Sequence, residues 1–341
     1  MVTLLGVRAL PEGFEIDALI GSLADGWGFD VEAADYTPVG AGSYHWVVTD
    51  LDGTRAFVTV DDLDQKPWLG DTRESAFDGL RAAFDTAVAL LDAGLAFVVA
   101  PIPTSGGETV RRIGARHTIA LLPFVDGQAG RFGYSDQGEW AAVVSILAEL
   151  HQATPVARSR ARSVGLDVPG RGHLESGLQE VDQTWSGGPF SEPARHALAD
   201  RADDVADLLA LADRLSANVE SRGSGWVVTH GEPHAANVMR TGESRVLVDW
   251  DTVALAPPER DLWMLAGETA DELAGVYAEA TGHRLDQDAV NFFRLTWDLK
   301  DLAEYLNVLR SPHRETEDTA RAYDGLTSCV SIRDRWAALL D

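Results

Sequence analysis

The chain has 341 residues, 45% of them hydrophobic, which is enough for a substantial core in one large or two smaller domains. Its 54 acidic residues outnumber 28 basic ones, and a net charge of −26 repels nucleic acids and anionic membranes. The single cysteine, Cys329, excludes a disulfide framework and a cysteine-based zinc site. The first residues lack the basic segment of a signal peptide, and Asp92 and two prolines interrupt the apolar stretch 87–103, so we expect a cytoplasmic protein.

The first part of the chain has the pattern of strands and turns around one helix. A glycine-rich turn at 40–42 leads into a β-prone segment, and apolar residues at helical spacing predict an amphipathic helix over 72–92. We expect strands within 36–50 and over 55–60, 97–101 and 116–124.

The composition then becomes helical. Helices are predicted over 140–152 and 194–219, with an exposed loop over 155–172 between them. Strands followed by helices indicate an α+β fold, with a boundary between two lobes near 123–127. We therefore expect two domains, residues 1–124 and residues 125–341.

The most informative motif is the pair of segments His230-Gly231-Glu232…Asn237 and Asp249-Trp250-Asp251. Each follows a short apolar run that predicts a strand. Phosphoryl transfer from ATP requires a carboxylate that orients or accepts the substrate's hydroxyl proton, and two further groups that hold Mg2+. Glu232, Asn237 and Asp249 have the residue types, order and spacing for these roles.

With this motif and the tail Pro257-Pro258-Glu259-Arg260-Asp261-Leu262, the chain resembles the aminoglycoside phosphotransferase family, nearest its spectinomycin-kinase-like branch. The resemblance implies a two-lobed protein-kinase-like fold. The small β-rich lobe with one helix would bind the nucleotide, and the larger, mainly helical lobe would carry the catalytic loop, the metal segment and the substrate-binding helices.

The resemblance also implies residue roles. Glu232 would be the catalytic base, at a position where the family has Asp, and His230 would be structural. Asn237 and Asp249 would bind Mg2+, and Asp251 would assist the metal or face the substrate. We further expect Asp261 to cap the helix that follows it.

Nucleotide binding is predicted for the first lobe. Gly40, Gly42 and Ser43 form either a plain hairpin or a cover over phosphate oxygens, which backbone N–H groups can approach where there is no Cβ. Phe124 and Val125 resemble the hinge between the lobes that binds adenine, although a buried strand end has the same sequence pattern.

The strand lysine of kinases is absent, because Thr59 stands at its position. Glu74 matches the acid that pairs with this lysine, but an acid in the first turn of a helix is also favoured by the helix dipole. Lys66, Arg111 or Arg112 could replace the missing cation.

Acceptor binding is predicted for a late helix. Asp298, Asp301 and Glu304 recur every three residues and therefore lie near one helical face. Such a row is either a solvated surface or, as the resemblance implies, a site for substrate amines.

We therefore expect a phosphotransferase that uses Mg2+, a nucleotide (ATP, with GTP as the alternative) and a small-molecule acceptor. The acceptor would be a hydroxylated and cationic molecule such as an aminoglycoside-like antibiotic. Kinases of choline, homoserine or sugars are alternatives, and so is a non-catalytic kinase-like protein that binds a nucleotide or a ligand. We expect neither a nucleic-acid nor a membrane partner, and the sequence leaves the oligomeric state open.

Overall fold

The computed structural model describes residues 10, 14–40, 42–66, 68–130, 137–223, 225–265 and 270–340. The contacts divide the chain into two compact units. The larger unit comprises Ala9–Val164 and Gly225–Leu285, and the smaller comprises Met1–Arg8, Gly165–Ser224 and Asp286–Asp341. These two compact units do not coincide with the two lobes expected from the sequence. The lobe boundary after residue 124 stays a prediction.

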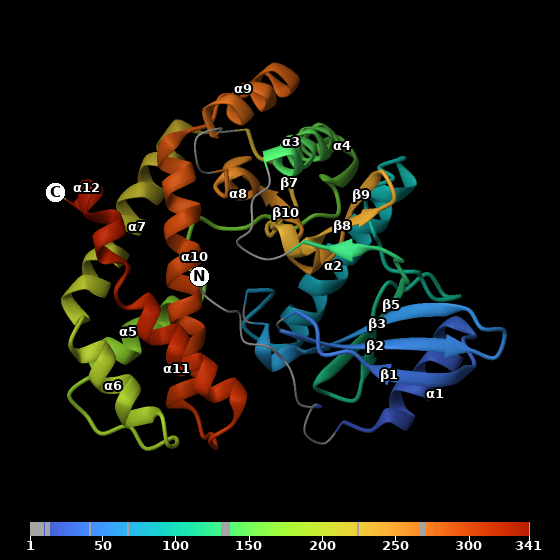
Figure 1. The fold of residues 1–341 in the computed structure, drawn as a ribbon, viewed down its shortest axis with the longest axis horizontal. Helices are drawn as coiled ribbons and strands as arrows, with labels where there is room; N and C mark the ends of the chain where they lie inside the picture. Colours follow the sequence, from blue (N-terminus) through green and yellow to red (C-terminus); the bar gives the residue numbers. More distant parts are fainter. Residues whose placement is uncertain are drawn as a thin grey trace. The chain divides into compact units, whose positions relative to one another are not determined.

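The larger unit contains an antiparallel sheet with the strand order β1-β2-β3-β5-β4. Its strands are β1 (Val31–Tyr36), β2 (Ser43–Asp50), β3 (Arg55–Asp62), β4 (Arg111–Ile113) and β5 (His117–Pro123). Figure 1 labels β1, β2, β3 and β5 of this sheet. Successive side chains of a strand point to opposite faces. Val58 of β3 therefore packs with Leu19 of helix α1 (Ile16–Trp27), whereas Ala120 of β5 packs with Leu80 of helix α2 (Arg73–Asp92). One helix covers each face.

The glycine turn and the first long helix confirm two predictions. Gly40 and Gly42 have φ angles of 73° and 81°, which favour glycine. Thr72 caps α2, because its hydroxyl accepts a hydrogen bond from the backbone N–H of Ser75 in a capping box. The structure also has strand β1, which the sequence did not predict because its side chains are exposed or only half-buried.

The strand predicted over 97–101 is wrong. In this stretch Val98 forms an isolated bridge with Leu247, and the N–H of Val99 donates to the carbonyl of Leu247. Pro101 and Pro103 lack N–H groups and cannot extend a ladder of hydrogen bonds. The segment is buried, which explains its strand-like composition.

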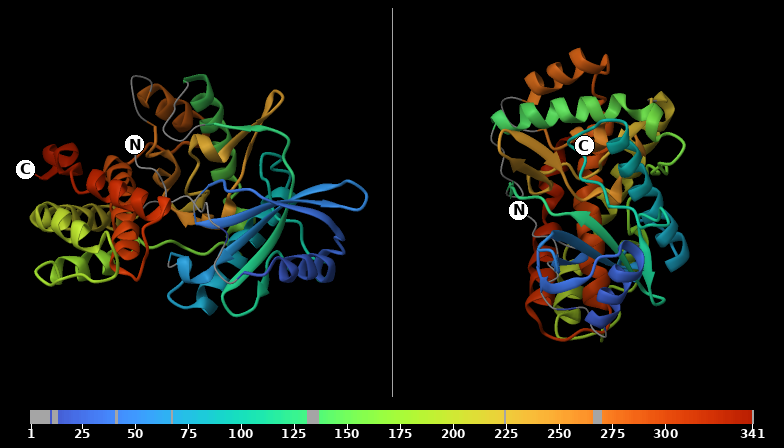
Figure 2. Two further views of the ribbon diagram at one scale, coloured as in Figure 1. Left: turned by 60° about the horizontal axis from the view of Figure 1, so that its bottom comes forward. Right: turned by 90° about the vertical axis from the view of Figure 1, so that its right-hand side faces the viewer.

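The rest of the larger unit surrounds two small sheets. Strands β7 (Val227–Thr229) and β10 (Ala254–Ala256) form one, and β6 (Gln128–Ala129), β8 (Val238–Thr241) and β9 (Ser244–Leu247) form the other. The helices are α3 (Gln137–Gln152), α4 (Thr154–Ala157), α8 (Glu259–Leu262) and α9 (Ala270–Thr281). Helices α3 (green) and α9 (orange) run side by side in both views of Figure 2. Leu147, Leu247 and Trp250 share one core with Leu90 of α2.

The smaller unit is helical in its described part. It contains α5 (Arg171–Gln179), α6 (Ser191–Ala199), α7 (Ala202–Arg222), α10 (Gln287–Arg310), α11 (Glu317–Cys329) and α12 (Ala337–Leu340). Helix α10 packs against α5, α7 and α11. The single helix predicted over 194–219 is wrong, because the chain breaks at Asp200 and Arg201 into α6 and α7. Within the described residues no helix is both long and apolar enough to cross a lipid bilayer.

Candidate active site

Asp261 holds the backbone of the loop that follows β7. Its carboxylate is fully buried and accepts hydrogen bonds from the N–H groups of His230, at 2.8 Å, and Gly231, at 2.6 Å. His151 of α3 donates to the same carboxylate from Nε2, at 3.0 Å. Burial by itself would raise the pKa of Asp261, but the hydrogen bond and charge of His151, together with Arg260, lower it below the ordinary value. The expectation that Asp261 caps the next helix is therefore corrected: Asp261 lies within α8, and its oxygens bind the loop that contains Glu232.

The backbone conformation of the loop and the position of Arg260 require glycine at position 231. Its φ angle is 99°, and a Cβ built on it would collide with the guanidinium of Arg260. The Arg260 guanidinium donates to the hydroxyl of Thr229, at 2.8 Å, and to the carbonyl of Thr252, at 3.0 Å. The arginine thus connects the two segments of the motif beneath the loop.

His230 has structural contacts on every side. Its Nε2 donates to the carbonyl of Val248, at 3.0 Å, and its own carbonyl accepts from the hydroxyl of Thr252, at 2.7 Å. The imidazole packs edge-on against Trp250, with ring centroids 4.7 Å apart, and burial lowers its pKa. These contacts join the loop that follows β7 to the segment 248–252, and the structural role of His230 stays a prediction.

The loop places Asn237 directly beside Glu232. The Asn237 side chain donates from Nδ2 to the carbonyl of Glu232, at 3.0 Å, and the backbone carbonyl of Asn237 accepts from the N–H of Val248, also at 3.0 Å. Because Nδ2 points to the Glu232 carbonyl, Oδ1 is the amide atom with which Asn237 could bind a cation. Asn237 is buried and Glu232 is half-buried.

Asp249 has a backbone conformation that is rare for a residue other than glycine. Its φ of 68° and ψ of 65° lie in the left-handed region, and it is the non-glycine residue with positive φ among those described. Solvent reaches Asp249, yet the protein atoms packed around its carboxyl raise its pKa, and the carboxylates of Asp251 and Glu232 raise it further. A cation bound beside Asp249 would offset this concentration of negative charge.

The donor set fits Mg2+ better than a metal held entirely by protein. Within the described ranges no group of three or more His, Cys, Asp or Glu side chains is placed to hold a metal. Mg2+ usually takes one or two carboxylates and completes its octahedron with phosphate oxygens and water. The carboxylate of Asp249 and the amide oxygen of Asn237 are suitable ligands of this kind.

Lys66 lies at the centre of a buried charge cluster. Its Nζ is 2.6 Å from Asp251 Oδ2, 2.7 Å from Asp61 Oδ1 and 2.9 Å from the hydroxyl of Ser43. The Ser43 hydroxyl in turn donates to Asp61, at 2.6 Å. Burial by itself would lower the pKa of Lys66, but the two carboxylates raise it above the ordinary value. Asp61 was missed by the sequence analysis, and its one signal was an acidic residue at the end of an apolar strand.

The remaining residues predicted for the nucleotide lie as follows. Thr59 is in register with His45, and its hydroxyl is 3.2 Å from His45 Nδ1. Glu74 forms an ion pair with Arg112 of β4, at 2.7 Å, and its side chain is 77% exposed. Phe124 follows β5, and the guanidinium of Arg55 lies 3.6 Å from its ring centroid. Glu74 is therefore a surface residue with a partner other than Lys66.

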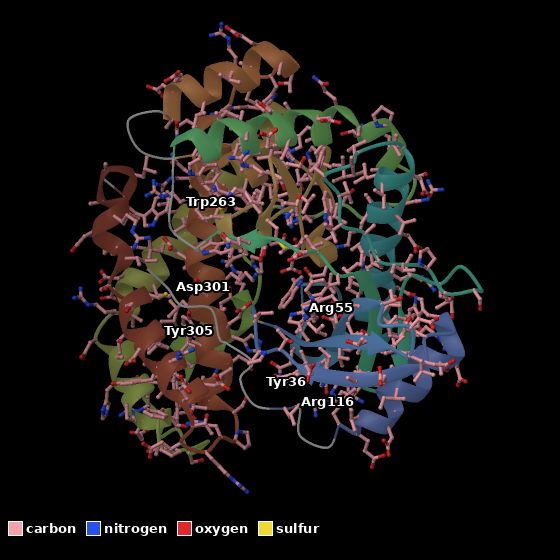
Figure 3. The ribbon with its side chains drawn as sticks, turned by 45° about the vertical axis from the view of Figure 1, so that its right-hand side comes forward. Tyr36, Arg55, Arg116, Trp263, Asp301 and Tyr305 are labelled. Atoms are coloured by element: carbon pink, nitrogen blue, oxygen red, sulfur yellow. The ribbon has the colours of Figure 1, made fainter. Side chains whose placement is uncertain are left out.

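The three acids predicted for the acceptor lie on α10, in the smaller unit, and Figure 3 shows Asp301 together with Tyr305 on this helix. Asp298 is buried and pairs with Arg335, at 3.1 Å. Asp301 is 2% exposed, and Glu304 lies 3.9 Å from Lys300. A fully solvated face is thus excluded for Asp298 and Asp301.

Solved structures and a curated relative share the fold or the sequence of this chain. A spectinomycin phosphotransferase in complex with ADP and spectinomycin aligns with a TM-score of 0.69 and 18% identity, over 95% of this chain and 98% of that one. An amicoumacin kinase in complex with AMP-PNP, Ca2+ and amicoumacin aligns with a TM-score of 0.59 and 13% identity, over 92% and 94% of the two chains. Protein StrN of Streptomyces griseus is 28% identical over 272 residues, 76% of this chain and 79% of StrN.

The structural likeness confirms the kinase-like α+β fold, with a small antiparallel sheet lobe and a helical lobe. The model of the phosphotransferase enzyme family matches residues 35–305, which include the glycine turn, the catalytic loop, the metal segment and most of α10. The chain belongs to the phosphotransferase enzyme family.

Proposed function

We propose that this enzyme transfers the γ-phosphate of ATP, in the presence of Mg2+, to a hydroxyl group of a small molecule that carries amines. The observation that carries the proposal is the convergence of Glu232, Asn237 and Asp249. Hydrogen bonds from Asn237 to the Glu232 carbonyl and from Val248 to the Asn237 carbonyl join the three within one continuous arrangement. Phosphoryl transfer depends on this kind of positioning and charge neutralisation.

Glu232 orients the acceptor hydroxyl and accepts its proton as the bond to phosphorus forms. Its side chain is one methylene longer than the Asp usual in the family, which would move the carboxylate by about 1.5 Å on an unchanged backbone. The loop is fixed at His230 and Gly231 by Asp261, immediately before this residue. The extra length is therefore accommodated by the acceptor's position or by the rotamer of Glu232.

Asn237 and Asp249 would hold Mg2+, which neutralises charge on the phosphate oxygens when it is bound. The glycine turn contributes flexible backbone: Gly40 and Gly42, at positive φ, let N–H groups approach phosphate oxygens. Phe124 and Val125 are proposed to bind the adenine. The nucleotides found in the spectinomycin phosphotransferase and the amicoumacin kinase support an adenine nucleotide for this chain as well.

The acceptor is proposed to be a hydroxylated polyamine of the aminoglycoside type. The net charge of −26 attracts such cations, and added salt screens this attraction and shortens its range. Asp298, Asp301 and Glu304 of α10 are proposed to bind its amines, and Asp298 also pairs with Arg335. The small molecules bound beside the nucleotide in the two solved structures, spectinomycin and amicoumacin, support a small-molecule acceptor for this chain.

The proposal is tested by a phosphotransfer screen with purified protein, Mg-ATP, aminoglycosides, spectinomycin and small amino alcohols. Glu232→Gln should lower kcat about a hundredfold or more on the active acceptor and leave ATP affinity within about twofold, because it removes the base and not a nucleotide ligand. Glu232→Asp should also be slower than wild type if the site is built for the longer side chain.

Glu108→Gln is the matched control, because Glu108 pairs with Arg111 on the surface at 3.4 Å and its side chain is 61% exposed. Its kcat should equal that of wild type. Full activity of Glu232→Gln would eliminate Glu232 as the base. A gain of activity in Glu232→Asp would mark the wild-type site as impaired.

A further inference from the structure

Lys66 reaches its buried position from an unusual part of the chain. It follows β3 and the short turn of 3-10 helix η1 (Leu63–Gln65), seven residues after Thr59. Its side chain is 1% exposed, although the amine is one of the most strongly hydrated groups in proteins. A lysine removed from water in this way needs either a structural or a functional reason.

The residues around Lys66 come from three parts of the predicted phosphate site. Ser43 begins β2 directly after the glycine turn, Asp61 lies near the end of β3, and Asp251 lies two residues after Asp249. Lys66 Nζ is within 2.9 Å of an oxygen of each. The amine therefore lies between the glycine turn and the metal segment. A nucleotide whose phosphates are covered by the glycine turn and bound to Mg2+ at the metal segment would pass this position.

The strand position of the kinase lysine faces the same side of the sheet. Thr59 and Asp61 are two residues apart on β3 and so point to one face, and their partners in register on β2 are His45 and Ser43. His45 is 3.2 Å from the Thr59 hydroxyl. Lys66 thus brings its charge to the face on which a strand lysine at position 59 would have placed it.

The charge of the cluster leaves room for a further cation beside Lys66. One amine contacts the carboxylates of Asp61 and Asp251, so these three groups carry a net single negative charge. The acids Asp249 and Glu232 and the cations Arg162 and Arg260 are further charged groups nearby. A Mg2+ ion bound by Asp249 and Asn237 would compensate the remaining negative charge, and the Lys66 amine could then contact a phosphate oxygen.

We propose that Lys66 is the phosphate-contacting lysine of this enzyme, supplied from the segment after β3 in place of the strand lysine, with Asp61 and Asp251 as its positioning residues. This inference rests on the proposed function, and it assigns the counterion role to Asp61 and Asp251. Glu74 is paired with Arg112 on the surface and has a different role.

The first experiment compares nucleotides in Lys66→Met and Lys66→Arg. Lys66→Met should weaken ATP binding at least tenfold and ADP binding less, leave adenosine binding within twofold, and lower kcat about a hundredfold or more. Lys66→Arg should recover part of the ATP affinity because it keeps the charge. Arg81→Met is the control, since Arg81 forms an exposed ion pair with Asp78 at 2.8 Å in the same unit. It should change none of these values.

The comparison separates the two roles of Lys66. If the lysine only stabilises the fold, Lys66→Met lowers the melting temperature and weakens ATP and adenosine binding by the same factor, and the inference is overturned. A second outcome is that wild-type protein phosphorylates no acceptor, while Lys66→Met lowers the affinity for ATP and not for adenosine. This outcome refutes the proposed function and supports the inference. Active wild type with full ATP affinity in Lys66→Met refutes the inference alone.

A second experiment uses the intact protein, in case Lys66→Met does not fold. The chain contains two lysines, Lys66 and Lys300. An acyl-phosphate derivative of ATP, which transfers its acyl group to amines beside the bound phosphates, should label the peptide that contains Lys66, and excess ATP should prevent this. Lys300 is the internal reference and should not be protected. The absence of ATP-protected label on Lys66 would overturn the inference.

Discussion

Asp261→Asn is expected to damage both the stability and the activity of the enzyme, although the residue contacts neither substrate nor nucleotide in the proposed mechanism. Its two carboxylate oxygens accept from two backbone N–H groups and from His151, at distances between 2.6 and 3.0 Å. A hydrogen bond to a charged group contributes about 1.5–3 kcal/mol. Asn keeps one acceptor oxygen and turns an NH2 group toward a donor, so we expect a loss of about 3–5 kcal/mol, as when a buried pair is broken.

The catalytic loss follows from the position of the loop. His230 and Gly231 precede Glu232, and a shift of about 1 Å at a catalytic group can lower the rate about a hundredfold. The assays are urea and thermal midpoints and kcat with Mg-ATP. Asp78→Asn, at a side chain that is 53% exposed, is the control and should match wild type. A free energy of unfolding within about 1 kcal/mol of wild type, together with unchanged kcat, would show that Asp261 does not hold the loop.

Three further predictions concern charge. Asp249→Asn should abolish the Mg2+-dependent part of the thermal stabilisation by ATP while the protein stays folded, because Asn tolerates the left-handed φ of 68°; an equal Mg2+-dependent shift in both proteins contradicts the assignment. Burial lowers the pKa of His45 from 6.5 to about 4, so stability present above pH 6.5 should fall by up to about 3 kcal/mol as the pH drops toward 4, and urea titrations of His45→Gln should lack this decline. Asp301→Asn should raise the KM of a polycationic acceptor and not that of ATP; unchanged KM for both would assign Asp301 to the core.

Local sequence patterns determined much of this protein. The helix 72–92 follows from apolar spacing and the Thr72 cap, and the glycine turn follows from residues that tolerate positive φ. The spacing of Glu232, Asn237 and Asp249 indicated the chemistry, because phosphoryl transfer requires those groups in that order. The family match over residues 35–305 confirms the phosphotransferase assignment.

Tertiary structure decided the contacts between residues distant in sequence. Lys66 and Asp251 are separated by 185 positions, and Asp261 and His151 by 110, so no local periodicity could pair them. The same reason explains the wrong strand prediction over 97–101. This buried segment has the composition of a strand, but its prolines cannot donate hydrogen bonds and it forms one isolated bridge, between Val98 and Leu247. Hydrophobic pattern reports whether a residue is buried, whereas its partners depend on the three-dimensional arrangement that burial produces.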